Sequence, residues 1–181
     1  MTPSTNQLKR FKRLENLSDS HLTLLIQAGA DVRVQSGRPL FQQNEVCKTF
    51  HIILEGYFKM VRETETGNKN LINVLGPGDP IGEHALFFGK YQATATALID
   101  SLVFKVPQAV YQALFSDDPG FSDRSEKHRS DQLQSFIERM DASGLDSAEF
   151  RLKKFFLRLA ARYGTQEGEN IVLPFALTRQ D

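Results

Sequence analysis

Short runs of alternating apolar and polar residues dominate the chain up to Val106. Such runs are typical of half-buried strands, and here they cover residues 31–35, 39–41, 50–54, 57–62, 70–75, 94–98 and 101–106. Turn-forming stretches separate them, for example Ser36-Gly37-Arg38-Pro39. An amphipathic helix over 18–28 comes first, with Ser18 or Ser20 as its cap. Many short strands at this spacing favour an antiparallel roll or jelly roll.

The pattern changes to helical spacing after Pro107. The helices expected there cover residues 108–115, 119–142 and 147–163. Ser143-Gly144 is expected to end the second helix, Asp146 to cap the third and Gly164 to end the third. After them we expect a polar loop over 165–169, a strand over 170–175 and the start of a helix over 177–181. The pattern as a whole predicts an α+β chain.

Composition narrows the class of protein. The 181 residues include 22 Lys and Arg and 22 Asp and Glu, so no basic field covers the whole chain, although local basic patches stay open. No apolar run approaches the roughly 20 residues that span a bilayer. Residues 1–15 are polar and basic, unlike a secretory signal, so a cytoplasmic location without a membrane anchor is expected. Cys47 is the only cysteine, which excludes an intramolecular disulfide and an all-cysteine iron–sulfur site.

The segment with the most informative chemistry is GPGDPIGEHALF, residues 76–87, followed by Ala-Thr-Ala at 93–95. It reads as a glycine-punctuated turn, a Gly82-Glu83 pair that opens a helical turn, and a small-residue strand. Backbone N–H groups at a helix start suit an anion, and a neighbouring carboxylate can accept hydrogen bonds from hydroxyl groups. We call residues 76–95 the cassette, because they resemble the phosphate-binding cassette of cyclic nucleotide-binding domains.

The order of elements, together with LPFALTRQD at 173–181, resembles the Crp/Fnr family of bacterial transcription regulators. The resemblance implies a polar segment over 1–16, an effector-sensing β-roll over 17–118 and a dimerisation helix over 119–143. It also implies a linker helix and the start of a truncated winged helix-turn-helix over 144–181, since Thr178-Arg179-Gln180-Asp181 matches its opening. On this basis the chain is expected to be a homodimer that acts on DNA through a domain absent from it.

The same resemblance implies two sets of functional residues. The effector site would be formed by Gly82, Glu83, His84, Ala85, Ala93, Thr94, Ser135 and Phe136. The helix pairing would use Leu133, Phe136, Ile137 and Met140, which recur at helical spacing. For Gly82 and Glu83 an equally good interpretation is structural, with Gly82 permitting a turn and Glu83 stabilising the following helix start.

Ala93 stands where such cassettes carry an arginine for the cyclic phosphate. A desolvated phosphate needs a charge-assisted partner, and Lys90 is better explained as a solvated loop lysine. Cyclic AMP is therefore expected to bind weakly or not at all.

Two alternatives stay open. Some family members sense nitric oxide or carbon monoxide through haem, and His51, His84 and His128 are the histidines considered for this role, although no close ligand pair exists among them. The chain could also be a stand-alone nucleotide-binding module that regulates a partner protein. No catalytic triad, paired-carboxylate motif or P-loop is recognisable, so no enzymatic activity and no protein-held metal site are expected.

Overall fold

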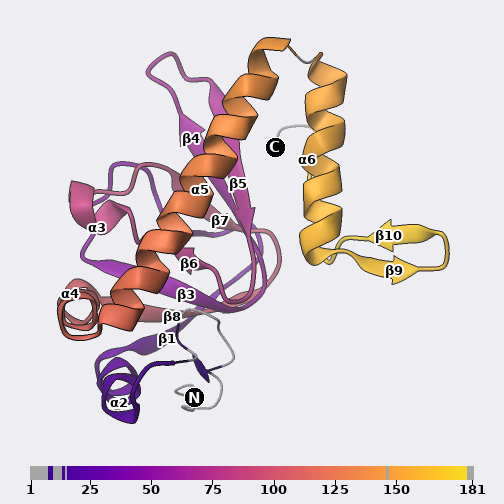
Figure 1. Cartoon of the computed structure of the whole chain (residues 1–181). Helices are drawn as coiled ribbons and strands as arrows, with labels where there is room; N and C mark the ends of the chain where they lie inside the picture. The colour runs from indigo at the N-terminus through magenta and orange to yellow at the C-terminus, as the bar shows by residue number, and fades with distance from the viewer. Residues whose placement is uncertain (1–7, 10–13, 15, 146, 179–181) are drawn as a thin grey trace. The chain divides into compact units, whose positions relative to one another are not determined.

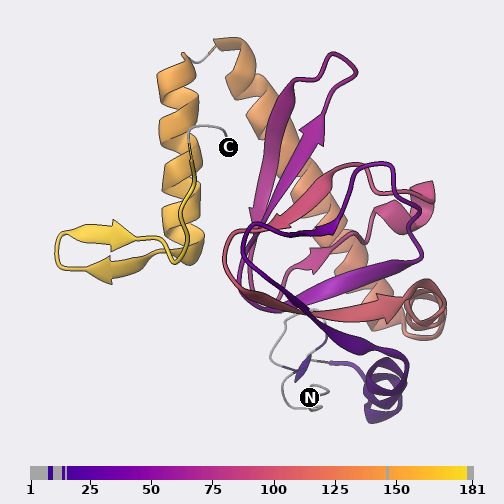
Figure 2. The ribbon, with the colours of Figure 1, turned by 180° about the vertical axis from the view of Figure 1, so that it is seen from behind.

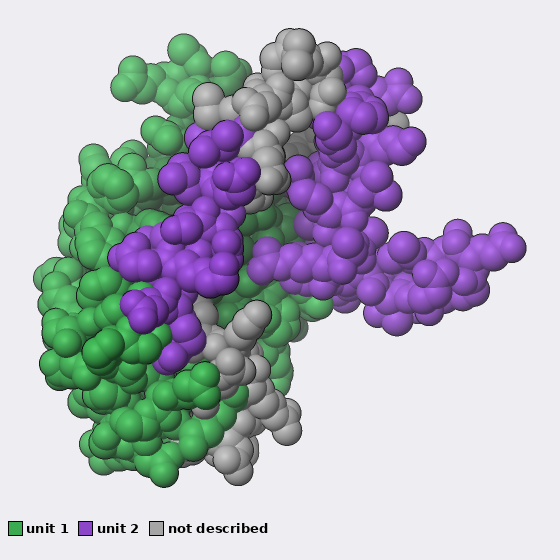
Figure 3. All heavy atoms as spheres, viewed as in Figure 1, with its two compact units in different colours: residues 1–122, 177–181 green, residues 123–176 purple. Residues whose placement is uncertain are grey.

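The computed structural model describes residues 8–9, 14, 16–145 and 147–178. They form two compact units, one built from residues up to Ser122 with the stretch from Leu177, and one spanning Asp123–Ala176 (Figure 3). Within the described residues, no helix combines the length and the apolar character needed to cross a bilayer.

The first unit is a β-roll made of two four-stranded sheets (Figures 1 and 2). Its elements are α2 Asp19–Ala28, β1 Ala30–Val34, β2 Pro39–Phe41, β3 Thr49–Glu55, β4 Phe58–Glu63, β5 Lys69–Leu75, β6 Pro80–Ile81, α3 Ala85–Phe88, β7 Thr94–Ala97, β8 Ser101–Pro107 and α4 Gln108–Asp117. The sheets have the strand orders β1-β8-β3-β6 and β2-β7-β4-β5, and all pairings within them are antiparallel. The antiparallel roll predicted from the sequence is confirmed.

Alternation along the strands explains how the core forms. In β7 the alanines Ala95 and Ala97 are buried, while the alternating threonines Thr94 and Thr96 are only half-buried. Large apolar side chains from both sheets, including Phe58, Ile53 and Phe104, are fully buried. Burial of this kind is the main favourable term in folding, and it gives the cassette, which follows β5, a rigid support.

The second unit contains most of a long helix, a further helix and a hairpin. These elements are α5 Pro119–Leu145, α6 Ala148–Tyr163, β9 Thr165–Glu167 and β10 Asn170–Val172, with β9 and β10 paired antiparallel. The first turn of α5, up to Ser122, belongs to the first unit.

Three expected boundaries are wrong. Helix α5 continues through Ser143-Gly144 to Leu145, so this pair does not end it. Ser147 caps α6 by accepting a hydrogen bond from Phe150 N at 3.2 Å, whereas Asp146 lies outside the described residues. Residues 165–169 are not a loop, because they supply the first strand of the β9–β10 hairpin and its turn, and the second strand ends at Val172. The expected helix start over 177–181 falls largely on residues 179–181, which lie outside the described residues.

Candidate functional site

A tight turn places the cassette at the end of the second sheet. Asp79 is buried, and its Oδ2 accepts a hydrogen bond from Gly76 N at 2.9 Å. Gly78 has a φ of +88° and donates its N–H to the carbonyl of Ile53 at 2.8 Å. The turn is thereby tied to β3, and the short strand β6 pairs with that same strand. The start of the cassette is therefore fixed by backbone geometry.

Backbone conformation and side-chain packing both favour glycine at position 82. Its φ is +85°, in the left-handed region that side chains disfavour. A Cβ added there would lie 2.8 Å from Cε1 of Tyr91, whose ring stacks on Phe41 with centroids 3.7 Å apart. The structural interpretation of Gly82 is thus sufficient, and an additional role in ligand contact stays a prediction.

The helical turn after Gly82 uses several of its own N–H groups. Ala85, Leu86 and Phe87 donate their N–H groups to the carbonyls three residues earlier, at 3.1, 3.2 and 3.1 Å. Helix α3 itself spans four residues. The anion-binding N–H groups expected from the sequence are therefore partly engaged within the turn.

The carboxyl group of Glu83 faces the interior of the first unit. Only 2 % of Glu83 is exposed, and its Oε1 accepts a hydrogen bond from the hydroxyl of Tyr111 on α4 at 2.7 Å. Tyr111 is itself 2 % exposed. The Glu83 side chain is therefore directed at α4 rather than at the start of α3.

Ala93 itself supplies no charge at the position where such cassettes carry an arginine. The Ala93 side chain is a buried methyl group, and the Oγ1 of Thr94 accepts a hydrogen bond from Gln43 N at 3.0 Å. Lys90 is exposed and pairs with Val46 in an isolated bridge. A desolvated phosphate beside Ala93 would lack the donor that an arginine supplies, and weak binding of cyclic AMP stays a prediction.

The remaining predicted residues divide between the two units. His84 is exposed at the start of α3, whereas Ala85 is buried. Ser135 and Phe136 are on α5 in the second unit, and their contribution to the effector site stays a prediction. Phe136 is exposed, and the side chains of Ser135 and Met140 lie outside the described part of the chain.

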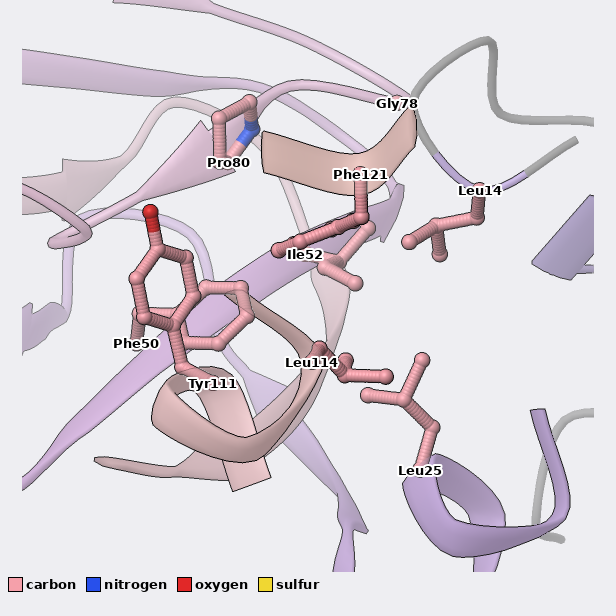
Figure 4. Close-up of a pocket in the computed structure, with 9 residues that line it drawn as sticks. All are labelled: Leu14, Leu25, Phe50, Ile52, Gly78, Pro80, Tyr111, Leu114 and Phe121. Atoms are coloured by element: carbon pink, nitrogen blue, oxygen red, sulfur yellow. The ribbon is translucent and has the colours of Figure 1, made fainter. Parts of the chain in front are cut away.

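Two cavities adjoin α4 in the first unit, and Tyr111 lines both. The first has a volume of about 20 Å³ and is lined by Leu14, Leu25, Phe50, Ile52, Gly78, Pro80, Tyr111, Leu114 and Phe121 (Figure 4). The second has a volume of about 130 Å³ and is lined by Leu86, Phe87, Gln108, Tyr111, Gln112, Phe115 and Ser116. Figure 4 shows the Tyr111 hydroxyl on the side of its ring away from Leu25 and Leu114.

Sequence reasoning missed Tyr111. It appeared only as one position of a short helix over 108–115, and its partner Glu83 is 28 residues away in the chain. The signal available in the sequence was a lone tyrosine on an apolar helix face, which most often fills a core.

The described histidines do not fit a haem. His51 is 5 % exposed on β3, and its burial, together with the charge of Lys105, lowers its pKa to about 4. No histidine lines either of the two cavities, and the first holds little more than one water molecule. Among the described residues, no group of three or more His, Cys, Asp or Glu is placed to hold a metal ion. Neither of these two cavities is therefore lined by a histidine that could bind a haem iron.

Cys47 is buried in the first unit. Its thiol lies 3.3 Å from the carbonyl of Thr49, and burial raises its pKa. Such a thiol is protonated at neutral pH and correspondingly unreactive.

Comparison with known proteins agrees with the fold of the first unit. Residues 31–118 match the cyclic nucleotide-binding domain family. The CRP-like cAMP-activated global transcriptional regulator of Mycobacterium tuberculosis is 24 % identical over 175 residues, covering 96 % of this chain and 78 % of that protein. Electron transport regulator A of Shewanella oneidensis is 26 % identical over 148 residues, or 82 % of this chain and 59 % of its own length. The lysophospholipase nte1 of Aspergillus terreus, an enzyme, is 25 % identical over 129 residues, or 71 % of this chain and 8 % of its own length.

Two solved structures share the fold. The sensor domain of the transcriptional regulator DNR from Pseudomonas aeruginosa has a TM-score of 0.65 at 24 % identity, covering 74 % of this chain and 91 % of that one. The catabolite activator protein of Thermus thermophilus has a TM-score of 0.63 at 20 % identity, covering 73 % of this chain and 62 % of that one. At these identities the likeness supports the fold alone.

Proposed function

Because this chain carries a cyclic nucleotide-binding domain and is homologous to transcription regulators of the Crp/Fnr family, we propose that it is the sensor and dimerisation region of an effector-controlled regulator. The cassette carries this proposal, because its turn contains Gly82 and the carboxyl group of Glu83, which can accept a hydrogen bond from a hydroxyl group. The effector would bind at Gly82, Glu83, His84, Ala85, Ala93 and Thr94, with Ser135 and Phe136 contributed by α5.

The proposed effector is not a typical cyclic nucleotide. Ala93 is buried and supplies no charge, so an anionic phosphate would be desolvated without a partner. Glu83 offers an acceptor for a hydroxyl group. A neutral or weakly charged molecule that bears hydroxyl groups therefore suits the cassette better than cyclic AMP.

A homodimer through α5 is the second part of the proposal. Leu133, Phe136 and Ile137 are 60 %, 49 % and 43 % exposed and recur at three- and four-residue spacing. Exposed apolar residues at this spacing are typical of helix-pairing surfaces. An effector would then act by binding two arrangements of the dimer with different affinity. The free energy by which it shifts the equilibrium between them cannot exceed the difference in its two binding free energies.

The output is proposed to be DNA binding through the region that begins in residues 144–181. Its described part carries basic side chains along α6, including Arg151, Lys154 and Arg158, which suit a phosphate backbone. The rival proposal, a stand-alone module that regulates a partner protein, is distinguished by the full gene, which would then encode no helix-turn-helix. A haem-based sensor would give a Soret band on reconstitution that one histidine substitution removes.

The proposal is tested by identifying what the chain binds. Native mass spectrometry of the purified protein should reveal a small molecule, and calorimetry should then measure its affinity. Glu83→Gln should weaken that binding at least tenfold, whereas Glu65→Gln, at an exposed turn, should leave it unchanged. Cyclic AMP should give little or no heat. Tight binding of cyclic AMP would overturn the effector assignment, and a strictly monomeric chain without any ligand would overturn the function.

A further inference from the structure

Tyr111 lies where the cassette, helix α4 and two cavities meet. Its hydroxyl donates to Glu83 Oε1 at 2.7 Å, and both side chains are 2 % exposed. Its ring contacts Phe50 and Phe121 edge-on, with centroids 5.2 and 5.8 Å apart, and Phe115 in a stacked arrangement at 6.0 Å. These ring contacts hold the Tyr111 hydroxyl against Glu83 in the conformation observed.

The hydrogen bond occupies an acceptor that the proposed effector would need. A buried polar group is costly when it has no partner, so Glu83 has a donor in the absence of ligand. The Tyr111 side chain donates through a hydroxyl group, and an effector that bears hydroxyl groups would use the same kind of donor. Without ligand, the Tyr111 hydroxyl therefore supplies the hydrogen bond to Glu83 that a ligand hydroxyl would supply in the complex.

We propose that Tyr111 is an internal substitute for the ligand hydroxyl, and that an effector binds the cassette only by displacing Tyr111 from Glu83. This inference rests on the proposed function, because it assumes that the cassette is the effector site. It makes Tyr111 the residue that sets how tightly any such molecule is held.

Displacement of Tyr111 would be passed on to the first turn of α5. The side chain of Ser122 donates to the carbonyl of Phe115 at 2.6 Å, and Asp118 Oδ1 accepts from Phe121 N at 2.8 Å. Ser122 N also donates to the carbonyl of Asp118 at 3.0 Å. Because the end of α4 and the start of α5 are joined by these bonds, a shift of α4 cannot leave Pro119–Ser122 in place.

The second cavity is consistent with this role. It has a volume of about 130 Å³ and shares Tyr111 with the first cavity, and the amide side chains Gln108 and Gln112 lie on its wall. Rotation of the Tyr111 ring toward this space would not require the core on the other side of α4 to repack. The ring therefore has room to move on one side of the helix.

Tyr111→Phe removes the hydroxyl while keeping the ring. Tyr57→Phe is the control, because Tyr57 is a half-buried tyrosine of the same unit that lies outside the cassette and outside α4. Hydrogen–deuterium exchange without ligand should be at least several-fold faster across residues 108–122 in Tyr111→Phe than in the control. Equal exchange in the two variants would overturn the link to α5.

Calorimetry with adenosine and with cyclic AMP at millimolar concentration tests the competition. Both probes carry ribose hydroxyl groups, and Tyr111→Phe should bind at least one of them about tenfold more tightly than the unaltered chain, because the competing bond is removed. Tyr57→Phe should bind like the unaltered chain. Equal heats for Tyr111→Phe and the unaltered chain, including no heat from either, would overturn the proposal. Dimerisation and DNA binding are measured separately, since their absence would contradict the proposed function but not this comparison.

Discussion

At the scale of single residues, Gly82 shows how backbone conformation and packing can demand the same side chain. Its φ of +85° disfavours any side chain, and the Tyr91 ring occupies the space that a Cβ would enter. Gly37 has a similar φ of +75° but no atom within 4 Å of an added Cβ. Comparing Gly82 with Gly37 therefore separates the effect of backbone strain from the effect of packing against Tyr91.

Gly82→Ala is expected to destabilise the protein by about 2–4 kcal/mol, from backbone strain plus overlap with Tyr91. Gly37→Ala should cost only the strain, about 1 kcal/mol. Urea unfolding followed by far-ultraviolet circular dichroism measures both. Equal losses in the two variants would show that the Tyr91 ring moves aside without cost.

His51 predicts a pH dependence of stability. Its pKa is about 4 in the folded protein, against about 6.5 in an unfolded chain. As pH falls from 6.5 to 4, the unfolded state takes up a proton that the folded state does not, so stability falls through this window. The loss between pH 7 and pH 5 should be about 2 kcal/mol. In His51→Gln this part of the loss should vanish, and parallel urea midpoints for both proteins would contradict the assignment.

The sequence was a good guide to part of the candidate site. The glycine-rich turn located Gly82 and Glu83 because turn chemistry is local. The Glu83–Tyr111 bond could not be predicted, since it joins residues 28 positions apart that only the packing of α4 on the roll brings together. For the same reason the stacking of Tyr91 on Phe41 could not be predicted from the pattern of apolar and polar residues.

At the scale of elements, strand alternation was the more reliable signal. Strand β2 was predicted with its observed bounds, Pro39–Phe41, since polar turn residues flank it on both sides. Helix ends were less well predicted: Ser143-Gly144 has the composition of a helix end, yet α5 continues to Leu145. The hairpin of β9 and β10 was missed because its first strand, Thr165–Glu167, is polar and fully exposed.

Helix α5 carries the prediction that concerns dimerisation. Phe136→Glu places a charge within the exposed apolar stripe, and it should weaken self-association at least tenfold because the charge would be desolvated. Asp131→Lys changes a charge at an exposed position on the opposite side of the helix and should have little effect. Sedimentation equilibrium measures both dissociation constants. An unchanged constant for Phe136→Glu would remove this stripe from the interface.

At the scale of the whole molecule, the main hydrophobic core lies within the first unit. Its buried members run from Leu8 to Phe121, and none comes from Asp123–Ala176. The stripe proposed for dimerisation lies entirely in the second unit. Stability of the roll and self-association therefore depend on separate parts of the chain.

A fragment of residues 1–122 is expected to fold and to be monomeric. It retains the core and the capping bonds at the start of α5, so it should unfold cooperatively in urea. It lacks Leu133, Phe136 and Ile137, so light scattering should give the mass of one protomer at concentrations where the 181-residue chain is dimeric. A fragment that is unfolded, or that still dimerises, would contradict this division.

The bond between Tyr111 and Glu83 has a further consequence for optical measurements. The chain has four tyrosines and no tryptophan, so its ultraviolet emission comes from phenol rings alone. A phenol that donates to a carboxyl group emits weakly, because the proton is drawn toward the acceptor in the excited state. A ligand that separates the Tyr111 hydroxyl from the Glu83 carboxyl would increase the tyrosine emission. Ligand binding could then be followed by intrinsic fluorescence without an added dye.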